Sequence, residues 1–354
     1  TGRNPEFHFM ATSPMASVIE ASSDAYPQCT EYRRRVILLK INEHDSVAID
    51  IFTVKGGSEH RYRVFSDLAT SDTPDGTLTF TGIDMPEEAP LPNTGNSLKA
   101  EDIFGLRDVR TATPTGNTVQ ATWSQPDKQY RLTLFTDQSM TIEASNGPGQ
   151  RSLEEAGRRV RYVDAVRKGE DLRSTFIAVH ESSSGSDEIE IRKIFKPLVG
   201  HDGGPNSEVF VIEGANGFNY LIMNNIDRAV RWGRVYFKGD FLCMKLKGIQ
   251  TVEYMTLGAQ ALKRDFTPLS VEGDHWSGSI TRIDEYTFEV DTPAPDLFTP
   301  PTDDIQAYVR IKTPDGWTGF PLKSIDGQRI TVDRFPLPES IEAMELPSVT
   351  YGKF

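Results

Sequence analysis

Residues 31–67 read EYRRRVILLKINEHDSVAIDIFTVKGGSEHRYRVFSD and carry the clearest folding signal in the chain. Within this stretch, residues 47–54 are apolar on both faces apart from one acid, Asp50, which predicts a central β-strand. The glycine pair at 56–57 then turns the chain, and residues 59–63 lead the next strand back. We therefore expect this region to form neighbouring antiparallel strands.

The alternation of apolar and polar residues continues along most of the sequence, and residues 130–134 (YRLTL) show it most cleanly. Asp-Gly and Asn-Gly pairs separate the apolar runs, and such pairs fit tight β-hairpins. Short strands joined by turns about every 8–12 residues are typical of an antiparallel sandwich. The expected strands cover residues 35–41, 47–54, 61–68, 78–80, 119–123, 130–134, 140–143, 174–180, 189–195, 209–213, 218–223, 234–237, 241–247, 251–257, 279–283, 287–290, 307–311 and 330–332.

Helical signals are scarce in the sequence. Residues 152–155 (SLEE) have the spacing of a capping box, but Gly157 follows one turn later, so we expect at most a short surface turn of helix. A chain of 354 residues is long enough for two or three domains, and a new set of short, proline-rich strands begins after residue 268. We therefore predict an all-β protein, with a large antiparallel β-sandwich over residues 1–265 and a small C-terminal β domain over residues 266–354.

The charge of the chain limits its partners. Its 38 basic and 51 acidic residues give a net charge of -13, and a field of that sign repels nucleic acid, whose non-specific binding depends on phosphate neutralisation. The sequence has no apolar run near the roughly 20 residues that a membrane helix needs. We therefore expect no nucleic-acid partner and no membrane partner, although local basic clusters could still hold an acidic substrate.

The acid inside the predicted central strand needs a partner, because an ionised carboxylate within a sheet is costly unless it is paired or hydrogen bonded. Arg33, Arg35 or His60 on neighbouring strands could supply that partner to Asp50. One interpretation is a structural ion pair that holds three strands in register; the other is a polar cluster that lines a substrate groove. The residues alone favour the structural interpretation.

Cysteine, histidine and tryptophan residues add further limits. The six histidines lack the close spacing of a zinc site, and two cysteines cannot form a four-thiolate site, so we expect no metal and no cofactor. We interpret Cys29 and Cys243 as ordinary buried thiols, although one disulfide between them stays open. Trp123 ends an alternating strand and is expected in the core. Trp276 and Trp317 lie near glycine-rich turns and are expected at the surface, where their rings could stack on a sugar.

Several runs of sequence occur in an order that is similar to one known family. The runs are VIEA at 18–21, YRRRVILL at 32–39, VAIDIF at 47–52, GGSEHRY at 56–62, PGQR at 148–151, RYV at 161–163 and STFIAV at 174–179. Together they resemble the β-sheet region of heparinase II/III-like polysaccharide lyases. The resemblance covers residues 5–265 and continues more weakly to the end of the chain.

This resemblance implies an N-terminal α/α-toroid, a central antiparallel β-sandwich and often a small C-terminal β domain. The toroid is absent here, so we expect this chain to be the β half of a longer lyase and to be inactive alone. The implied function is to form one wall of a cleft in which uronate-containing polysaccharide is cleaved by β-elimination. The implied partners are the acidic polysaccharide, the toroid of the same protein and, as an option, a second copy in a homodimer, with a periplasmic or extracellular location.

The resemblance also implies site residues. His8 stands upstream of the VIEA run, where the family often has a histidine, and His60 matches the family histidine after the glycine pair; both are catalytic candidates. Asp50 matches a zinc ligand of some members, but Ser66 stands where a second histidine often follows, so no metal is expected there. The substrate-binding candidates, four of which would add local positive charge, are Arg33, Arg35, Arg61, Arg63 and Trp317.

Two other functions stay open from the sequence. A non-catalytic carbohydrate-binding module would bind polysaccharide through an exposed tryptophan such as Trp317. A purely structural or assembly role would instead present an apolar interface to another domain or subunit.

Overall fold

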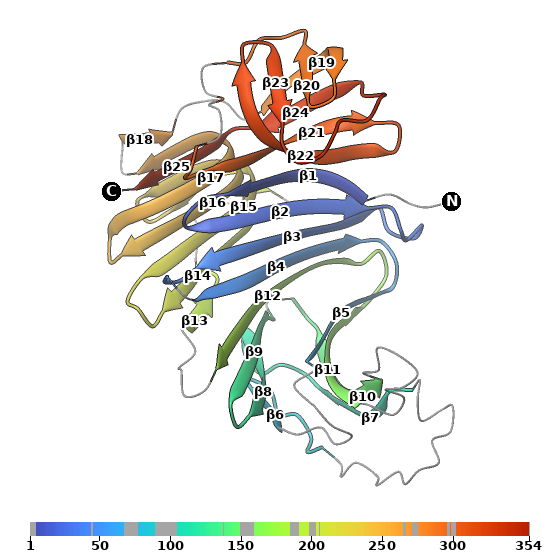
Figure 1. Ribbon diagram of the computed structural model, residues 1–354. Helices are drawn as coiled ribbons and strands as arrows, with labels where there is room; N and C mark the ends of the chain where they lie inside the picture. Colours follow the sequence, from blue (N-terminus) through green and yellow to red (C-terminus); the bar gives the residue numbers. More distant parts are fainter. Residues whose placement is uncertain are drawn as a thin grey trace. The chain divides into compact units, whose positions relative to one another are not determined.

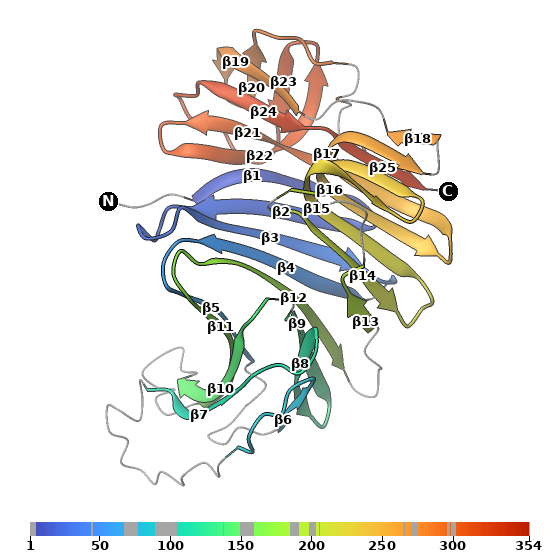
Figure 2. The same cartoon turned by 180° about the vertical axis from the view of Figure 1, so that it is seen from behind.

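A computed structural model describes most of the chain (Figure 1). The described residues are 5–43, 45–66, 77–88, 105–136, 138–148, 159–184, 191–197, 203–204, 206–264, 267–270, 275–295, 298 and 302–353. Every regular element within these ranges is a β-strand, and every ladder between them is antiparallel (Figures 1 and 2), which confirms the predicted all-β class. The helical turn expected at 152–155 lies outside the described residues.

The chain divides into two compact units. The first unit comprises Thr1–Tyr26, Arg33–Ser46 and Glu190–Phe354, and the second comprises Pro27–Tyr32 and Val47–Ile189. The boundaries of these units differ from the boundary at residue 265 that the sequence predicted. The separate domain expected over residues 266–354 stays a prediction.

The first sheet of the first unit has the strand order β22–β23–β20–β19–β24–β21–β1–β2–β3. An additional pairing of β21 with β22 closes β19 to β24 into a small barrel, which buries apolar side chains such as Val309, Ile330 and Met344. The C-terminal strands thus form the small β structure that the predicted fold class includes. The bounds are β1 Pro5–Thr12, β2 Ala16–Ser23, β3 Glu31–Lys40, β19 His275–Asp284, β20 Thr287–Val290, β21 Gln306–Thr313, β22 Gly316–Asp326, β23 Arg329–Val332 and β24 Ala343–Pro347.

The second sheet of the first unit has the order β13–β14–β15–β16–β17–β18, and β25 also pairs with β17. Its long central strands bury one apolar cluster that includes Phe237, Leu242 and Met244, each with no exposed surface. Cys243 lies in the same strand, and burial raises the pKa of its thiol to about 12. The bounds are β13 Ile191–Phe195, β14 Glu208–Gly214, β15 Asn219–Trp232, β16 Val235–Lys247, β17 Gln250–Arg264, β18 Thr267–Ser270 and β25 Val349–Lys353.

The second unit is a sandwich of two sheets, β4–β12–β9–β8–β6 and β5–β11–β10–β7. Side chains from both sheets form one core, in which Phe176 stacks on Tyr62 with 5.7 Å between ring centroids. Trp123 is 3% exposed in this core, which confirms its predicted burial. The bounds are β4 Ser46–Lys55, β5 Glu59–Ser66, β6 Thr77–Thr81, β7 Arg107–Ala112, β8 Thr118–Gln125, β9 Lys128–Phe135, β10 Thr141–Pro148, β11 Arg159–Lys168 and β12 Arg173–Ser184.

The glycine pair after β4 has a different role from the one the sequence predicted. β4 pairs with β12 and β5 pairs with β11, so residues 56–57 carry the chain from one sheet of the sandwich to the other and do not close a hairpin. Gly56 and Gly57 have φ angles of 95° and 83°, which favour glycine. The prediction that these two strands are direct neighbours is therefore wrong.

Candidate functional site

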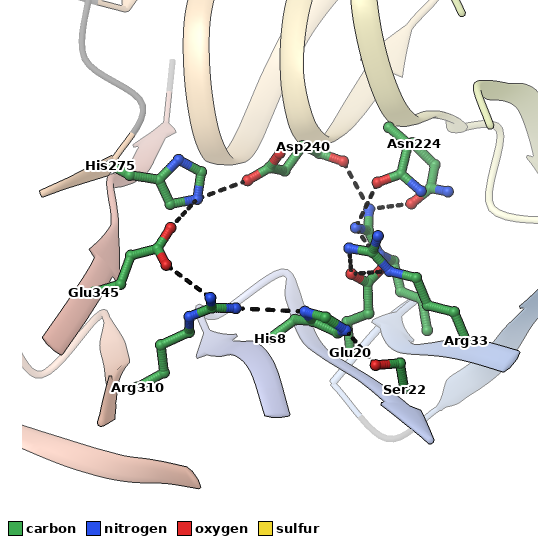
Figure 3. A network of polar contacts seen from close by, with 11 residues as sticks. His8, Glu20, Ser22, Arg33, Asn224, Asp240, His275, Arg310 and Glu345 are labelled. Atoms are coloured by element: carbon green, nitrogen blue, oxygen red, sulfur yellow. Dashed lines mark hydrogen bonds and ion pairs between the residues drawn. The ribbon is translucent and has the colours of Figure 1, made fainter. Parts of the chain in front are cut away.

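A network of polar side chains joins several strands of the first unit (Figure 3). It links β1, β2 and β3 to β15 and β16 and to the barrel strands β19, β21 and β24. Its members are His8, Glu20, Ser22, Arg33, Arg35, Asn224, Asn225, Asp240, His275, Arg310 and Glu345.

Arg35 is the buried centre of this network, since its side chain is only 1% exposed. Its Nε donates to Glu20 Oε2 at 2.6 Å, and its Nη1 donates to the carbonyl oxygen of Asp240 at 2.7 Å. The Arg35 guanidinium also donates to the side-chain oxygens of Asn224 and Asn225. Burial lowers the pKa of Arg35, but the guanidinium stays charged because its intrinsic pKa is so high. Arg35 therefore ties β2 and β3 to the second sheet of the unit.

Arg33 binds the same carboxylate from the solvent side. Its Nε donates to Glu20 Oε1 at 2.7 Å, and its side chain is 31% exposed, whereas Glu20 is 1% exposed. One buried carboxylate is therefore shared by two guanidinium groups, of which Arg33 is the more exposed.

His8 is placed by an irregularity of β1. Phe7 pairs with Ala21 and Phe9 pairs with Glu20, so His8 is the extra residue of a β-bulge between them. Bulges of this kind turn a side chain out of the regular alternation of a strand, and they are common beside functional sites. As a result, the half-buried His8 side chain lies between Arg310 and Ser22 (Figure 3).

The two contacts of His8 define its tautomer. Arg310 Nη1 lies 3.4 Å from His8 Nδ1, and because a guanidinium only donates, Nδ1 must be the acceptor. His8 Nε2 then carries the proton and donates to Ser22 Oγ at 2.8 Å. Burial, together with the positive charge of Arg33, lowers the pKa of His8 to about 4. His8 is therefore neutral at neutral pH.

Arg310 connects His8 to the barrel. Its Nη2 lies 2.8 Å from Glu345 Oε2, on the neighbouring strand β24, and its Cζ lies 4.2 Å from the centroid of the Trp317 ring. His275 Nε2 lies 3.2 Å from Asp240 Oδ2 and 3.8 Å from Glu345 Oε1, so it joins the two carboxylates. The network therefore contains the guanidinium groups of Arg33, Arg35 and Arg310 and the carboxylates of Glu20, Asp240 and Glu345.

The structure brings together only some of the predicted site residues. Arg33, Arg35 and His8 belong to the network of the first unit, and Trp317 packs on its edge with a partly exposed ring. The prediction that Trp276 is exposed is wrong, because the side chain is 3% exposed and its ring packs on Phe298 in the barrel core.

The remaining candidates lie in the second unit. Arg61 and Arg63 both bind the buried carboxylate of Asp164, and Arg61 also binds Glu143 at 2.5 Å. His60 is 4% exposed. Its Nδ1 is 2.8 Å from Ser174 Oγ and its Nε2 is 2.6 Å from the Gly56 carbonyl oxygen, a geometry that fits a role in holding the turn after β4.

The buried acid of β4 has a partner that the sequence did not suggest. Tyr62 Oη donates to Asp50 Oδ2 at 2.7 Å, whereas Arg33 and Arg35 bind Glu20. The same tyrosine oxygen lies 3.0 Å from His180 Nε2, and His180 Nδ1 lies 2.6 Å from Tyr130 Oη. Since Tyr62 gives its proton to Asp50, His180 Nε2 carries the next proton and Tyr130 donates to Nδ1.

This second cluster is a one-directional chain of hydrogen bonds from Tyr130 to Asp50. Burial raises the pKa of Tyr130, so its hydroxyl is protonated at neutral pH. Tyr62 thus donates a hydrogen bond to Asp50, where the sequence predicted an arginine or His60 as the partner.

No arrangement of three or more His, Cys, Asp or Glu side chains suited to a metal ion occurs in the part of the chain that the structure describes. The same part contains no helix long and apolar enough to span a membrane. Both cysteines are free thiols, with Cys243 buried and Cys29 partly exposed. No protein-family model matches the sequence, and no curated protein matches it significantly. The similarity to heparinase II/III-like lyases therefore rests on the sequence runs alone and stays a prediction.

Proposed function

We propose that the chain forms one wall of the substrate cleft of a polysaccharide lyase that acts on uronate-containing polysaccharide. The observation that carries this proposal is the placement of a neutral His8 at a β-bulge of the first unit, between Arg310 and Ser22 and within the electrostatic influence of Arg33. The sequence resemblance supplies the reaction class, and the His8 geometry supplies groups of the kinds that this reaction uses.

β-Elimination has three requirements. A base takes the proton at C5 of the uronate, the bond from C4 to the glycosidic oxygen breaks as a C4–C5 double bond forms, and the leaving oxygen gains a proton. The uronate carboxylate must also be neutralised, because negative charge builds up beside it in the transition state. Arginine suits the last task, since its fork of donors matches a carboxylate.

In this proposal the substrate carboxylate binds Arg310, with support from the charge of Arg33. The contact of Arg310 Nη1 with His8 is long, at 3.4 Å, and a carboxylate could replace it at low cost. His8 Nδ1 would then have an open lone pair, and neutralisation of the nearby positive charge would raise the pKa of His8. His8 would thus become a better proton acceptor only after the substrate binds.

The second proton-transfer group would come from the N-terminal toroid that the resemblance implies. We accordingly propose a periplasmic or extracellular location, where such polysaccharides occur, and leave the homodimer as an option. The isolated chain is expected to bind substrate without turning it over.

The test is isothermal titration calorimetry, in which the full chain is titrated separately with alginate, heparan sulfate, chondroitin and hyaluronan. Binding of at least one polysaccharide is expected, and Arg310→Ala should weaken it about tenfold or more. Arg282→Ala is a matched control, because Arg282 lies on β19 of the same unit and is 75% exposed. Equal binding by the two variants, or no binding by the unchanged chain, would overturn the proposal.

A parallel assay measures the absorbance of unsaturated uronate products. Robust turnover by this chain alone would contradict the proposal that the second proton-transfer group comes from another domain.

A non-catalytic binding module is the second candidate, and the partly exposed Trp317 beside Arg310 favours it. It predicts that Trp317→Ala abolishes polysaccharide binding while His8→Gln leaves binding and its pH dependence unchanged.

A further inference from the structure

Phe65 is an exposed aromatic residue on the outer face of the sheet β5–β11–β10–β7 in the second unit. Its side chain is 54% exposed. Directly opposite on the next strand lies Tyr162, and the two ring centroids are 5.1 Å apart at an interplanar angle of 38°. Neighbouring residues of these strands, such as Tyr62 and Val163, point into the core instead. Single exposed aromatics are common, but an exposed ring paired with a second ring forms a surface that can hold a ligand.

A glycine on the next strand extends this surface. A Cβ at Gly147 of β10 would lie 2.5 Å from Tyr162 Cε2 and 2.8 Å from Leu106 Cδ2, so both side chains occupy the space that a larger residue would need. Leu106 is 39% exposed. Phe65, Tyr162 and Leu106 therefore form an apolar stripe that runs across the strands, and we call these three residues with Arg63 the outer platform.

Arg63 supplies charge at the edge of the stripe. Its Nε and Nη2 both donate to Asp164 at 2.8 Å, which fixes the guanidinium, and its Cζ lies 5.3 Å from the Tyr162 ring centroid. The Nη1 group has no hydrogen-bond partner among the described residues, and the side chain is 39% exposed. Asp164 is shared with Arg61, but Arg61 also pairs with Glu143 and Glu59, so the charges of this cluster are largely matched. What Arg63 offers to solvent is therefore the N–H donors of its Nη1 group.

We propose that the outer platform is a second saccharide-binding site, which takes an acidic sugar unit. The apolar C–H face of the sugar ring would lie on Phe65 and Tyr162, and the carboxylate or sulfate group would accept hydrogen bonds from Arg63 Nη1. A flat ring that carries an anionic group matches both parts of the platform, whereas a neutral apolar partner would leave the Arg63 Nη1 donors without an acceptor. The site shares its ligand class with the proposed function, but none of its residues belongs to the His8 network.

The experiment uses a uronic-acid hexasaccharide and the full chain with His8→Ala and Arg310→Ala already in place, so that binding at the first site is removed. Calorimetry should still detect binding. Phe65→Ala should weaken it about tenfold, as expected for loss of an aromatic stacking partner. Arg63→Lys should weaken it less, because it keeps the charge and the contact with Asp164 but loses the fork of donors.

Phe335→Ala is the matched control, because Phe335 is a phenylalanine of similar exposure, 59%, in the first unit. Affinity unchanged in Phe65→Ala, or lowered equally in Phe335→Ala, would overturn the proposal. Light scattering adds a separate arm: if Phe65→Ala changes the oligomeric state and leaves hexasaccharide binding intact, the platform is a protein interface. If only the proposed His8 site is wrong, Arg310→Ala will not change the affinity of the chain for the hexasaccharide, whereas Phe65→Ala will still weaken it.

Discussion

Replacing Arg35 by alanine should destabilise the first unit strongly. The change removes the buried guanidinium that binds Glu20, Asn224, Asn225 and the carbonyl of Asp240. Removing one partner of a buried ion pair costs about 3–5 kcal/mol, since the other charge stays buried with less compensation. Because Arg33 still binds Glu20, we expect the lower part of that range, about 3 kcal/mol.

Urea unfolding followed by tryptophan fluorescence measures this change. Three of the four tryptophans, Trp232, Trp276 and Trp317, lie in the first unit, so the signal reports mainly on it. At a typical urea slope of about 1–3 kcal/mol per molar, the midpoint should fall by roughly 1–3 M with the slope unchanged.

Arg33→Ala is the matched control for this experiment. Arg33 binds the same carboxylate from the same strand, but its side chain is 31% exposed where Arg35 is 1% exposed. Solvent screens the exposed pair, so its loss should cost about 1 kcal/mol or less. If the two variants lose equal stability, or if Arg35→Ala costs less than about 1 kcal/mol, burial is not what makes the Arg35 contacts important.

Three further predictions concern single residues. The pKa of His8 is about 4 in the folded chain against 6.5 as the ordinary value, so the unfolded chain binds more protons between these pH values. The unfolding free energy should therefore fall as pH drops from 6.5 to 4, and urea titrations at several pH values measure this fall. His8→Gln should reduce the fall. If the unfolding free energies of the two proteins change in parallel with pH, the lowered pKa of His8 is contradicted. Gly56→Ala should lower the stability of the fold more than Gly57→Ala. Both residues have a positive φ, but only a Cβ at Gly56 would overlap a backbone carbonyl oxygen, that of Gln28. The melting temperatures of the two variants compare these losses directly. Tyr62→Phe removes the donor to the buried Asp50 and should cost about 1–3 kcal/mol by chemical unfolding, whereas an unchanged midpoint would show that other groups satisfy the carboxylate.

The regular strands could be predicted from the sequence because their apolar residues alternate. The run at 47–54 became β4, and the run at 130–134 lies within β9. β1, β22 and β24 lie outside the predicted ranges, as do β7, β11, β18 and β25, and for the first three there is a physical reason. The bulge at His8 interrupts the period of two in β1, β22 contains a proline that is unusual inside a strand, and β24 is a short run that ends in proline.

The candidate site was only partly predictable for a related reason. His8, Arg33 and Arg35 were singled out, but Arg310 and Glu345 come from strands more than 280 residues further along the chain than His8. Each appears in its own strand as an ordinary polar residue of an alternating pattern. Among these later members, only His275 is of a residue type that the sequence analysis weighed, as one of six histidines that lack the spacing of a zinc site.

The balance of charge in the His8 network limits how any anion can bind there. Arg310 is already paired with Glu345, so a carboxylate ligand must compete with an internal carboxylate for the same guanidinium. The ligand has an advantage at Arg310 Nη1, where the present partner is the neutral His8 at 3.4 Å, and none at Nη2, where Glu345 lies at 2.8 Å. Binding at Nη1 releases His8 Nδ1 and leaves the Glu345 contact in place. In the proposed cleft, the bulge that presents His8 and the ion pair that holds Arg310 would therefore act together: a carboxylate at Nη1 would meet His8 without breaking the contact with Glu345.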